Sequence, residues 1–188
     1  LIDLLKQNEQ RGQLYVSWIN AEKIAYTGDL IHLNDIEVFP SDLPSGVFAP
    51  GDVMVSFRNT NTVMVFDSKS WRMKYRISDA FVSQHDPEFI DGNTISLYDN
   101  NNLSRKNQTV YSRVVWVDAR DNSVTSKFQG SQSMPVYSGI LGKHQWLANG
   151  NLLFTESIGG RGIEVDPQGN VIWQYTNLIM PGKTYGIQ

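Results

Sequence analysis

The chain has 188 residues, of which 40% are hydrophobic and 19% charged, with a net charge of −3 and no cysteine. This composition suits one domain with a real core and excludes a disordered chain. Disulfides, cysteine metal sites and a cysteine nucleophile are excluded, and there is neither a basic run for nucleic acid nor an apolar stretch of about 18 residues for a membrane helix.

The chain begins with Leu1 in the run LIDLLKQNEQRGQ, without Met or a signal-type segment. We therefore expect an internal piece of a longer protein, with any signal segment upstream. Only residues 1–10 have a pattern that fits one or two helical turns. Residues 12–31 have the pattern of outer strands from an incomplete repeat.

All three histidines open equivalent segments of a repeat: His32 opens HLNDIEVFP, His85 opens HDPEFIDGN and His144 opens HQWLANGN. After each histidine come a glycine, a second apolar run and an aliphatic–Asp step. The glycines and aspartates are Gly51, Gly92 and Gly150, and Asp67, Asp118 and Asp166. Their separations are 16, 26 and 16 residues, so the second repeat carries a ten-residue insertion.

Within each repeat, short segments rich in Val, Ile, Tyr, Phe and Trp alternate with Gly, Asn and Asp turns, which predicts four short antiparallel strands. A β-sandwich also has short strands but has no reason to repeat the His–Gly–Asp order. We predict an all-β fold, a β-propeller of four-stranded blades with about three and a half blades present. We expect one domain, with blade remnants at 1–31, blades at approximately 32–80, 81–130 and 140–178, and the next blade starting at 179–188.

The first strand of a blade lies near the central channel, so the three histidines would converge there. Asn34 follows His32 on the same strand face, and Arg58 ends the second strand of that blade, which makes a group of donors for an anion. At the position of Arg58 the later repeats have Asp99 and Ser157. The alternatives are a histidine that bonds only to a neighbouring turn and an arginine in a weak surface ion pair.

Two other kinds of site are weaker. A metal site would combine the histidines with Glu37 or Glu88, but no close HxH or HxxE spacing supports one, and we expect neither metal nor cofactor. Asp35, Asp86 and Glu88 could supply a carboxylate pair for glycoside hydrolysis, but capping turns or pairing across strands is the simpler role for them.

The runs HLNDIEVFP, PGDVMVSFRNTNTVMVFD, FVSQHDPEFIDGN and LANGNLLFTESIGGRGIEVDPQGNVIWQY resemble the arylsulfotransferase (aryl-sulfate sulfotransferase) family over about residues 28–178. The resemblance implies a six-bladed propeller, typically periplasmic in bacteria, that moves a sulfuryl group between phenols without a nucleotide donor. It implies a periplasmic or secreted location here. The upstream blades, which in the family carry another histidine and pocket tyrosines, are not in this sequence.

The resemblance also assigns roles. It implies that His85, which follows Gln84, is the nucleophile that forms a sulfohistidine, with His32 and Arg58 as the other catalytic residues. His144 matches no catalytic residue of the family, so we expect it beside the channel, in a substrate-binding role. The remaining substrate-binding residues implied are Asn34, Thr155 and Glu156.

The expected partners are phenolic sulfates and phenols, with Tyr98 or Phe154 as stacking aromatics. An alternative is a non-catalytic propeller that binds a small ligand or a protein partner in its channel. A channel hydrolase or lyase for glycans would need an axial carboxylate or tyrosine, and Glu156 is the candidate present. The upstream sequence would discriminate among these three functions.

Overall fold

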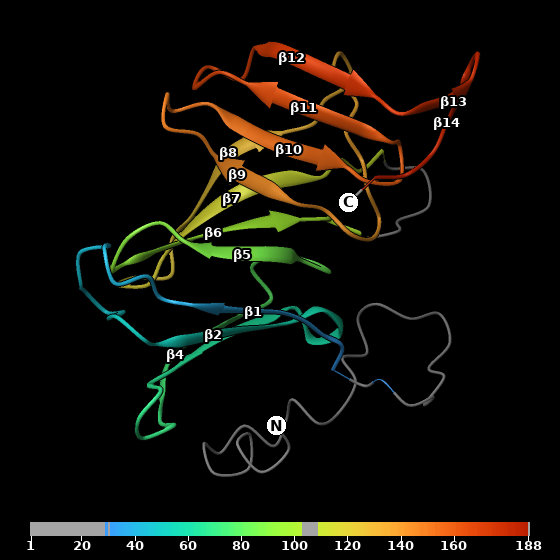
Figure 1. Ribbon diagram of the computed structural model, residues 1–188. Helices are drawn as coiled ribbons and strands as arrows, with labels where there is room; N and C mark the ends of the chain where they lie inside the picture. Colours follow the sequence, from blue (N-terminus) through green and yellow to red (C-terminus); the bar gives the residue numbers. More distant parts are fainter. Residues whose placement is uncertain (1–28, 30, 103–108, 188) are drawn as a thin grey trace.

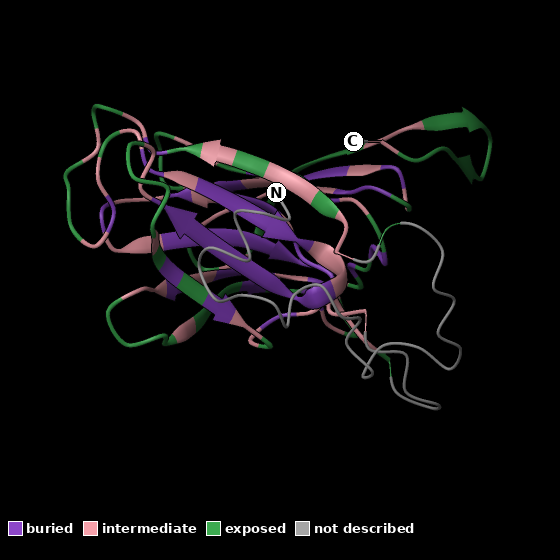
Figure 2. Cartoon of the chain, turned by 90° about the horizontal axis from the view of Figure 1, so that it is seen from below, coloured by how far each residue is buried: buried purple, intermediate pink, exposed green. Residues whose placement is uncertain are grey.

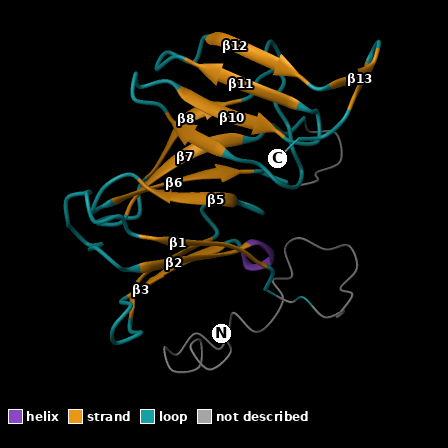
Figure 3. Cartoon of the chain, in the orientation of Figure 1, coloured by secondary structure: helices purple, strands orange, loops and turns teal. Residues whose placement is uncertain are grey.

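The computed structural model describes residues 29, 31–102 and 109–187, and this part of the chain is all-β (Figure 1, Figure 3). It contains three four-stranded sheets, each with its strands paired antiparallel in sequence order. The first sheet contains β1 (Leu33–Val38), β2 (Val53–Phe57), β3 (Thr62–Phe66) and β4 (Met73–Ser78), and the 3-10 helix η3 (Arg58–Thr60) connects β2 to β3. The second contains β5 (His85–Phe89), β6 (Thr94–Asp99), β7 (Arg113–Asp118) and β8 (Val124–Gln129). The third contains β9 (His144–Trp146), β10 (Leu152–Glu156), β11 (Arg161–Val165) and β12 (Val171–Thr176), followed by a hairpin of β13 (Leu178–Met180) and β14 (Lys183–Thr184).

The prediction of a β-propeller built from four-stranded antiparallel blades is confirmed. The edge strands β1 and β5 lie side by side (Figure 1), as the innermost strands of neighbouring blades do. The incomplete blade and the helical turns expected within residues 1–31 lie outside the described residues, except for Asp29 and Ile31. The predicted insertion falls between β6 and β7, where 103–108 also lie outside them.

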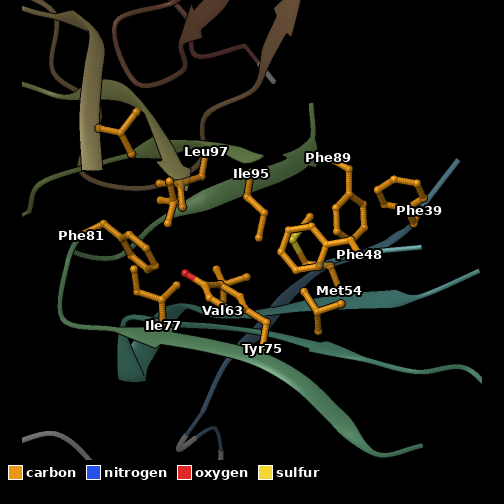
Figure 4. Close-up of a cluster of buried hydrophobic side chains, with 13 residues drawn as sticks. Phe39, Phe48, Met54, Val63, Tyr75, Ile77, Phe81, Phe89, Ile95 and Leu97 are labelled. Atoms are coloured by element: carbon orange, nitrogen blue, oxygen red, sulfur yellow. The ribbon is translucent and has the colours of Figure 1, made fainter. Parts of the chain in front are cut away.

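Neighbouring sheets are joined by apolar cores. Between the first and second sheets, Phe39, Phe48 and Phe89 pack edge to face with ring centroids 5.0 and 5.2 Å apart (Figure 4). The rest of this core comes from β2, β3, β4, β6 and β7 and from Phe81, in the loop between β4 and β5. A second cluster joins the second and third sheets and includes Tyr98, Val114 and Phe154. Because β3 packs on both faces, all five of its residues are buried, and buried residues concentrate in the middle strands (Figure 2).

The repeated glycines and aspartates have local structural reasons. Gly51 and Gly150 have φ values of 88° and 85°, which favour glycine. At Gly92, a Cβ atom would collide with the backbone of Ser45 and Gly46. Asp118 is the last residue of a third strand, and Asp67 and Asp166 directly follow theirs. In each case a carboxylate oxygen accepts a backbone N–H group of the following turn. Sequence repetition therefore marks the turns that close each blade.

The last strands leave apolar side chains uncovered. Five of the six residues in β12 are exposed, as are all residues of β13 and β14. The hairpin lies apart from the three sheets in Figure 1. Among the described residues, no helix has the length and apolar character needed to cross a membrane.

Candidate functional site

Two neighbouring blades bring four of the predicted residues together. His32 immediately precedes β1, and His85 is the first residue of β5, the adjacent inner strand. The backbone N–H of Arg58 donates to the carbonyl of His32 at 2.9 Å, which fixes the start of η3 against the start of β1. Asn34 Nδ2 donates to the carbonyl of Gln84 at 2.7 Å, directly before His85. The inner edge of the first and second sheets therefore gathers two imidazoles, a guanidinium and an amide.

Hydrogen bonding determines which nitrogen of His85 carries the proton. Nδ1 lies 3.0 Å from the carbonyl of Ser83 and 2.7 Å from Asn100 Oδ1. Asn100 is fully buried, and its Nδ2 donates to the carbonyls of Ser138 and Leu141 at 2.7 and 2.6 Å. Its oxygen must therefore face His85. Since both partners of Nδ1 are acceptors, Nδ1 is the N–H donor, and the neutral ring presents a lone pair at Nε2.

The surroundings of His85 favour the neutral imidazole. Burial lowers the pKa of His85, and the nearby charges of Arg58 and His32 lower it further, whereas the hydrogen bonds to Asn100 and Ser83 act in the opposite direction. The net pKa lies below the ordinary histidine value. At neutral pH the side chain is therefore uncharged and able to act as a nucleophile.

Arg58 is a half-buried cation without an acidic partner. Its Nη1 donates to Asn59 Oδ1 at 3.0 Å, and it forms no ion pair with any residue that the structure describes. Burial lowers the pKa of Arg58, but a guanidinium keeps its charge at neutral pH. A partly desolvated guanidinium that has no carboxylate beside it suits an anionic ligand.

His32 is a more exposed partner on the same edge. Its Nδ1 lies 2.6 Å from Asp29 Oδ2, and the two side chains are 42% and 64% exposed. Nδ1 is therefore the donor to the carboxylate. Within the described residues Nε2 has no hydrogen-bond partner, so this nitrogen can exchange a proton with a ligand.

The three candidates from the third sheet have protein partners. Thr155 Oγ1 accepts the N–H of Lys143 at 2.9 Å and lies 3.1 Å from Ser157 Oγ. Glu156 is 8% exposed and accepts hydrogen bonds from Arg161 Nε at 2.6 Å and the backbone N–H of Tyr137 at 2.9 Å. The contacts of Glu156 are those of a structural ion pair.

His144 is also bound within the protein. It is 4% exposed, its Nδ1 lies 3.0 Å from Asp86 Oδ2, and its Nε2 lies 2.6 Å from Ser96 Oγ. Both ring nitrogens are used, so we leave His144 and Glu156 out of the proposed site. Tyr98 and Phe154 are each 1% exposed in the core between the second and third sheets, which corrects the suggestion that they stack on a substrate.

The amino-acid sequence was compared with models of known protein families. The family model described as Arylsulfotransferase (ASST) matches residues 6–178. The chain belongs to the arylsulfotransferase family. The resemblance predicted from the sequence is thereby confirmed, and the match covers all three described blades.

Solved structures similar to this chain include the PQQ-bound aldose sugar dehydrogenase from Streptomyces coelicolor. It is 14% identical over 80% of this chain and 53% of its own, with a TM-score of 0.39. BamB from Moraxella catarrhalis is 14% identical over 70% of this chain and 46% of its own, with a TM-score of 0.34. The chain thus spans about half the length of these two structures. No curated protein matches it.

Two residues that lie beside these side chains were not assigned to the candidate site from the sequence. Asn100 follows β6, fifteen residues after His85, and no motif marks it. For Asp86 the sequence predicts a carboxylate that caps a turn, pairs across strands or acts in glycoside hydrolysis. It is 5% exposed and bonds Lys143 and His144. The sequence signal that could have indicated a role for Asp86 beside the site was its position between His85 and Pro87.

Proposed function

We propose that the whole protein is a nucleotide-independent aryl-sulfate sulfotransferase that works through a sulfohistidine at His85. The observation that carries this proposal is the hydrogen bonding of His85 Nδ1 to Asn100 and Ser83, which leaves Nε2 as a free lone pair near Arg58. Membership of the arylsulfotransferase family supports the reaction class.

In the first half-reaction, His85 Nε2 attacks the sulfur of an aryl sulfate. The N–S bond forms as the S–O(aryl) bond breaks, and the aryl oxygen leaves with the electron pair. Protonated His32 donates a proton from Nε2 to the leaving phenolate, while Nδ1 of His32 remains bonded to Asp29. The products are a phenol and sulfated His85, which keeps its Nδ1 proton on Asn100.

In the second half-reaction, an acceptor phenol gives its proton to Nε2 of the now neutral His32. Its oxygen attacks the sulfur, the N–S bond breaks, and the electron pair returns to His85 Nε2. The protons balance, because His32 recovers the one that it donated. Each half-reaction uses the same groups in opposite directions, which suits a transfer between chemically similar donors and acceptors.

Arg58 has the electrostatic role. Its guanidinium donates to the sulfuryl oxygens, whose charge changes as the sulfur moves between oxygen and nitrogen. A preorganised donor of this kind contributes about 3 kcal/mol to the barrier. We assign Asn34 to holding the residue before His85, with Thr155 left as a further candidate for substrate contact.

The proposed substrates are phenolic sulfates and phenols, and the proposed location is periplasmic or secreted. The family supports the substrates and the location. The lack of cysteine is consistent with a compartment outside the cytoplasm.

The test uses the full-length protein and its His85→Asn variant, with p-nitrophenyl sulfate as donor and phenol as acceptor. We expect p-nitrophenol release that requires phenol, and its loss in the variant, because asparagine has no nucleophilic nitrogen. Release without phenol would indicate a hydrolase. Full activity of His85→Asn would refute the covalent mechanism, and no release by the wild type would favour a binding propeller.

A further inference from the structure

The inner strand of the second blade is irregular immediately after His85. In the β5–β6 ladder His85 pairs with Tyr98, and the next pair is Glu88 with Ser96. Three steps along β5 therefore match two along β6, which is a β-bulge at Asp86 and Pro87. Asp86 has a φ of 53°, in the left-handed region, although a residue before proline prefers extended backbone. This conformation needs support from neighbouring groups.

The neighbouring blade supplies that support. The carboxylate of Asp86 accepts hydrogen bonds from Lys143 Nζ at 2.5 Å, from the backbone N–H of His144 at 2.6 Å and from His144 Nδ1 at 3.0 Å. Burial tends to raise the pKa of Asp86, but the hydrogen bonds from His144 and Lys143 outweigh burial and hold it below the ordinary value. The carboxylate is therefore ionised at neutral pH and bonded to the first strand of the third blade.

The network closes back on the second blade. His144 donates from Nδ1 to Asp86, so its Nε2 accepts the hydroxyl proton of Ser96, 2.6 Å away. Ser96 Oγ in turn accepts from Trp146 Nε1 at 2.9 Å. Ser96 lies opposite Glu88, at the far end of the bulge. Both sides of the bulge are thus fastened to β9.

The first blade has a similar arrangement. In the β1–β2 ladder Leu33 pairs with Phe57 and Asp35 with Ser56, so Asn34 is the extra residue of a bulge. Its amide donates to the carbonyl of Gln84, in the blade that follows. In both blades a bulged residue reaches the start of the next inner strand.

We propose that Asp86 is a positioning residue for His85, held by Lys143 and His144. This inference rests on the proposed function in assigning the nucleophile role to His85. A strand that slips by one residue turns its side chains to the opposite face. Without the bonds from β9 the bulge relaxes, and His85 loses its alignment with Asn100. The proposal also gives the buried His144 a role, as a partner of Asp86.

The experiment compares Asp86→Asn, Lys143→Met and the control Asp52→Asn in the full-length protein. Asp52 is a matched control because it is 3% exposed, lies 2.6 Å from Lys74 Nζ and accepts the N–H of Ala49 at 2.8 Å, all within the first blade. Asparagine at 86 retains the shape and the tolerance of positive φ but removes the charge. Methionine at 143 removes one bond from a side chain that is 57% exposed.

We expect kcat to fall about 100-fold in Asp86→Asn, as for a misplacement of about 1 Å, with little change in KM for the aryl sulfate. Lys143→Met should give a smaller loss, and Asp52→Asn should leave both constants unchanged. Equal losses in Asp86→Asn and Asp52→Asn would show a general effect of removing a buried ion pair and would overturn the proposal.

A second measurement does not depend on turnover. Long-range proton–nitrogen NMR reports the tautomer of His85, which should be the single Nδ1–H form in the wild type and in Asp52→Asn. In Asp86→Asn we expect that signature to be lost. An unchanged signature would overturn the positioning role, whether or not the protein transfers sulfate. Absence of transfer by a wild type with the expected signature would instead overturn only the proposed function.

Discussion

Replacing Arg58 with glutamine tests the electrostatic part of the site. Apart from the bond to Asn59, the Arg58 side chain has no hydrogen-bond or ion-pair partner among the described residues, and its backbone bond to His32 is retained in the variant. The substitution therefore removes a cation and little native structure. Losing one preorganised donor costs about 3 kcal/mol. This corresponds to a fall in kcat/KM of about 100-fold.

The same variant should change the pH dependence. Arg58 is one of the groups that lower the pKa of His85, so its removal raises that pKa. In the proposed mechanism the reactive form is neutral His85, whose fraction falls as the pH drops through the pKa. The acid limb of the kcat/KM profile should therefore move to higher pH in Arg58→Gln. This additional loss of kcat/KM is confined to acidic pH, and it adds to the fall of about 100-fold that is expected at every pH.

Stability should not fall in parallel. Arg58 is partly desolvated without a carboxylate to compensate, so glutamine removes an unfavourable burial of charge. We would measure kcat/KM against pH and the thermal midpoint, with Arg120→Gln as control, since Arg120 is 66% exposed and paired with Asp118 on the outer part of the second blade. Wild-type kcat/KM in Arg58→Gln, or an acid limb that stays in place, would refute the assigned role.

Two further predictions follow from contacts in the second blade. Asn100→Leu removes an acceptor from His85 Nδ1. Because one hydrogen bond is worth about 1.4 kcal/mol, kcat should fall about tenfold with KM unchanged. An unaltered kcat in steady-state assays would contradict this. Gly92→Ala places a Cβ against the backbone of Ser45 and Gly46 and should cost about 2 kcal/mol. Gly169→Ala, at a turn with open space and a φ of 84°, should cost only about 1 kcal/mol. Equal thermal midpoints for the two glycine variants would count against the steric argument.

The fold was predictable because its determinants are local. Gly51 and Gly150 mark positive-φ turns, and Asp67, Asp118 and Asp166 cap the turns after the third strands. Each of these interactions is made within a few residues, so it recurs visibly in the sequence. Because the turns recur once in each blade, their spacing in the sequence indicates the length of a blade.

The site was only partly predictable. The shared position of His32 and His85 indicated that they lie on the same inner edge, and the structure brings Asn34 and Arg58 to the same edge; their catalytic roles remain predictions. The same reasoning placed His144 beside the channel, but Asp86 and Ser96 occupy both its nitrogens. These contacts join residues about fifty positions apart and depend on the bulge at Asp86, which no periodicity indicates.

The side chain of Gln84 has a consequence for how such a protein can change over evolution. It is fully buried in the preceding blade, where Nε2 donates to Ser56 Oγ and to the carbonyls of Phe57 and Thr62. The residue before His85 therefore belongs by its contacts to the first blade and by its sequence to the second. A duplication or exchange that cut the gene between these blades would separate His85 from the surface that anchors it. The edge that carries His32 and His85 is inherited intact only when the two adjacent blades are duplicated or exchanged as one piece.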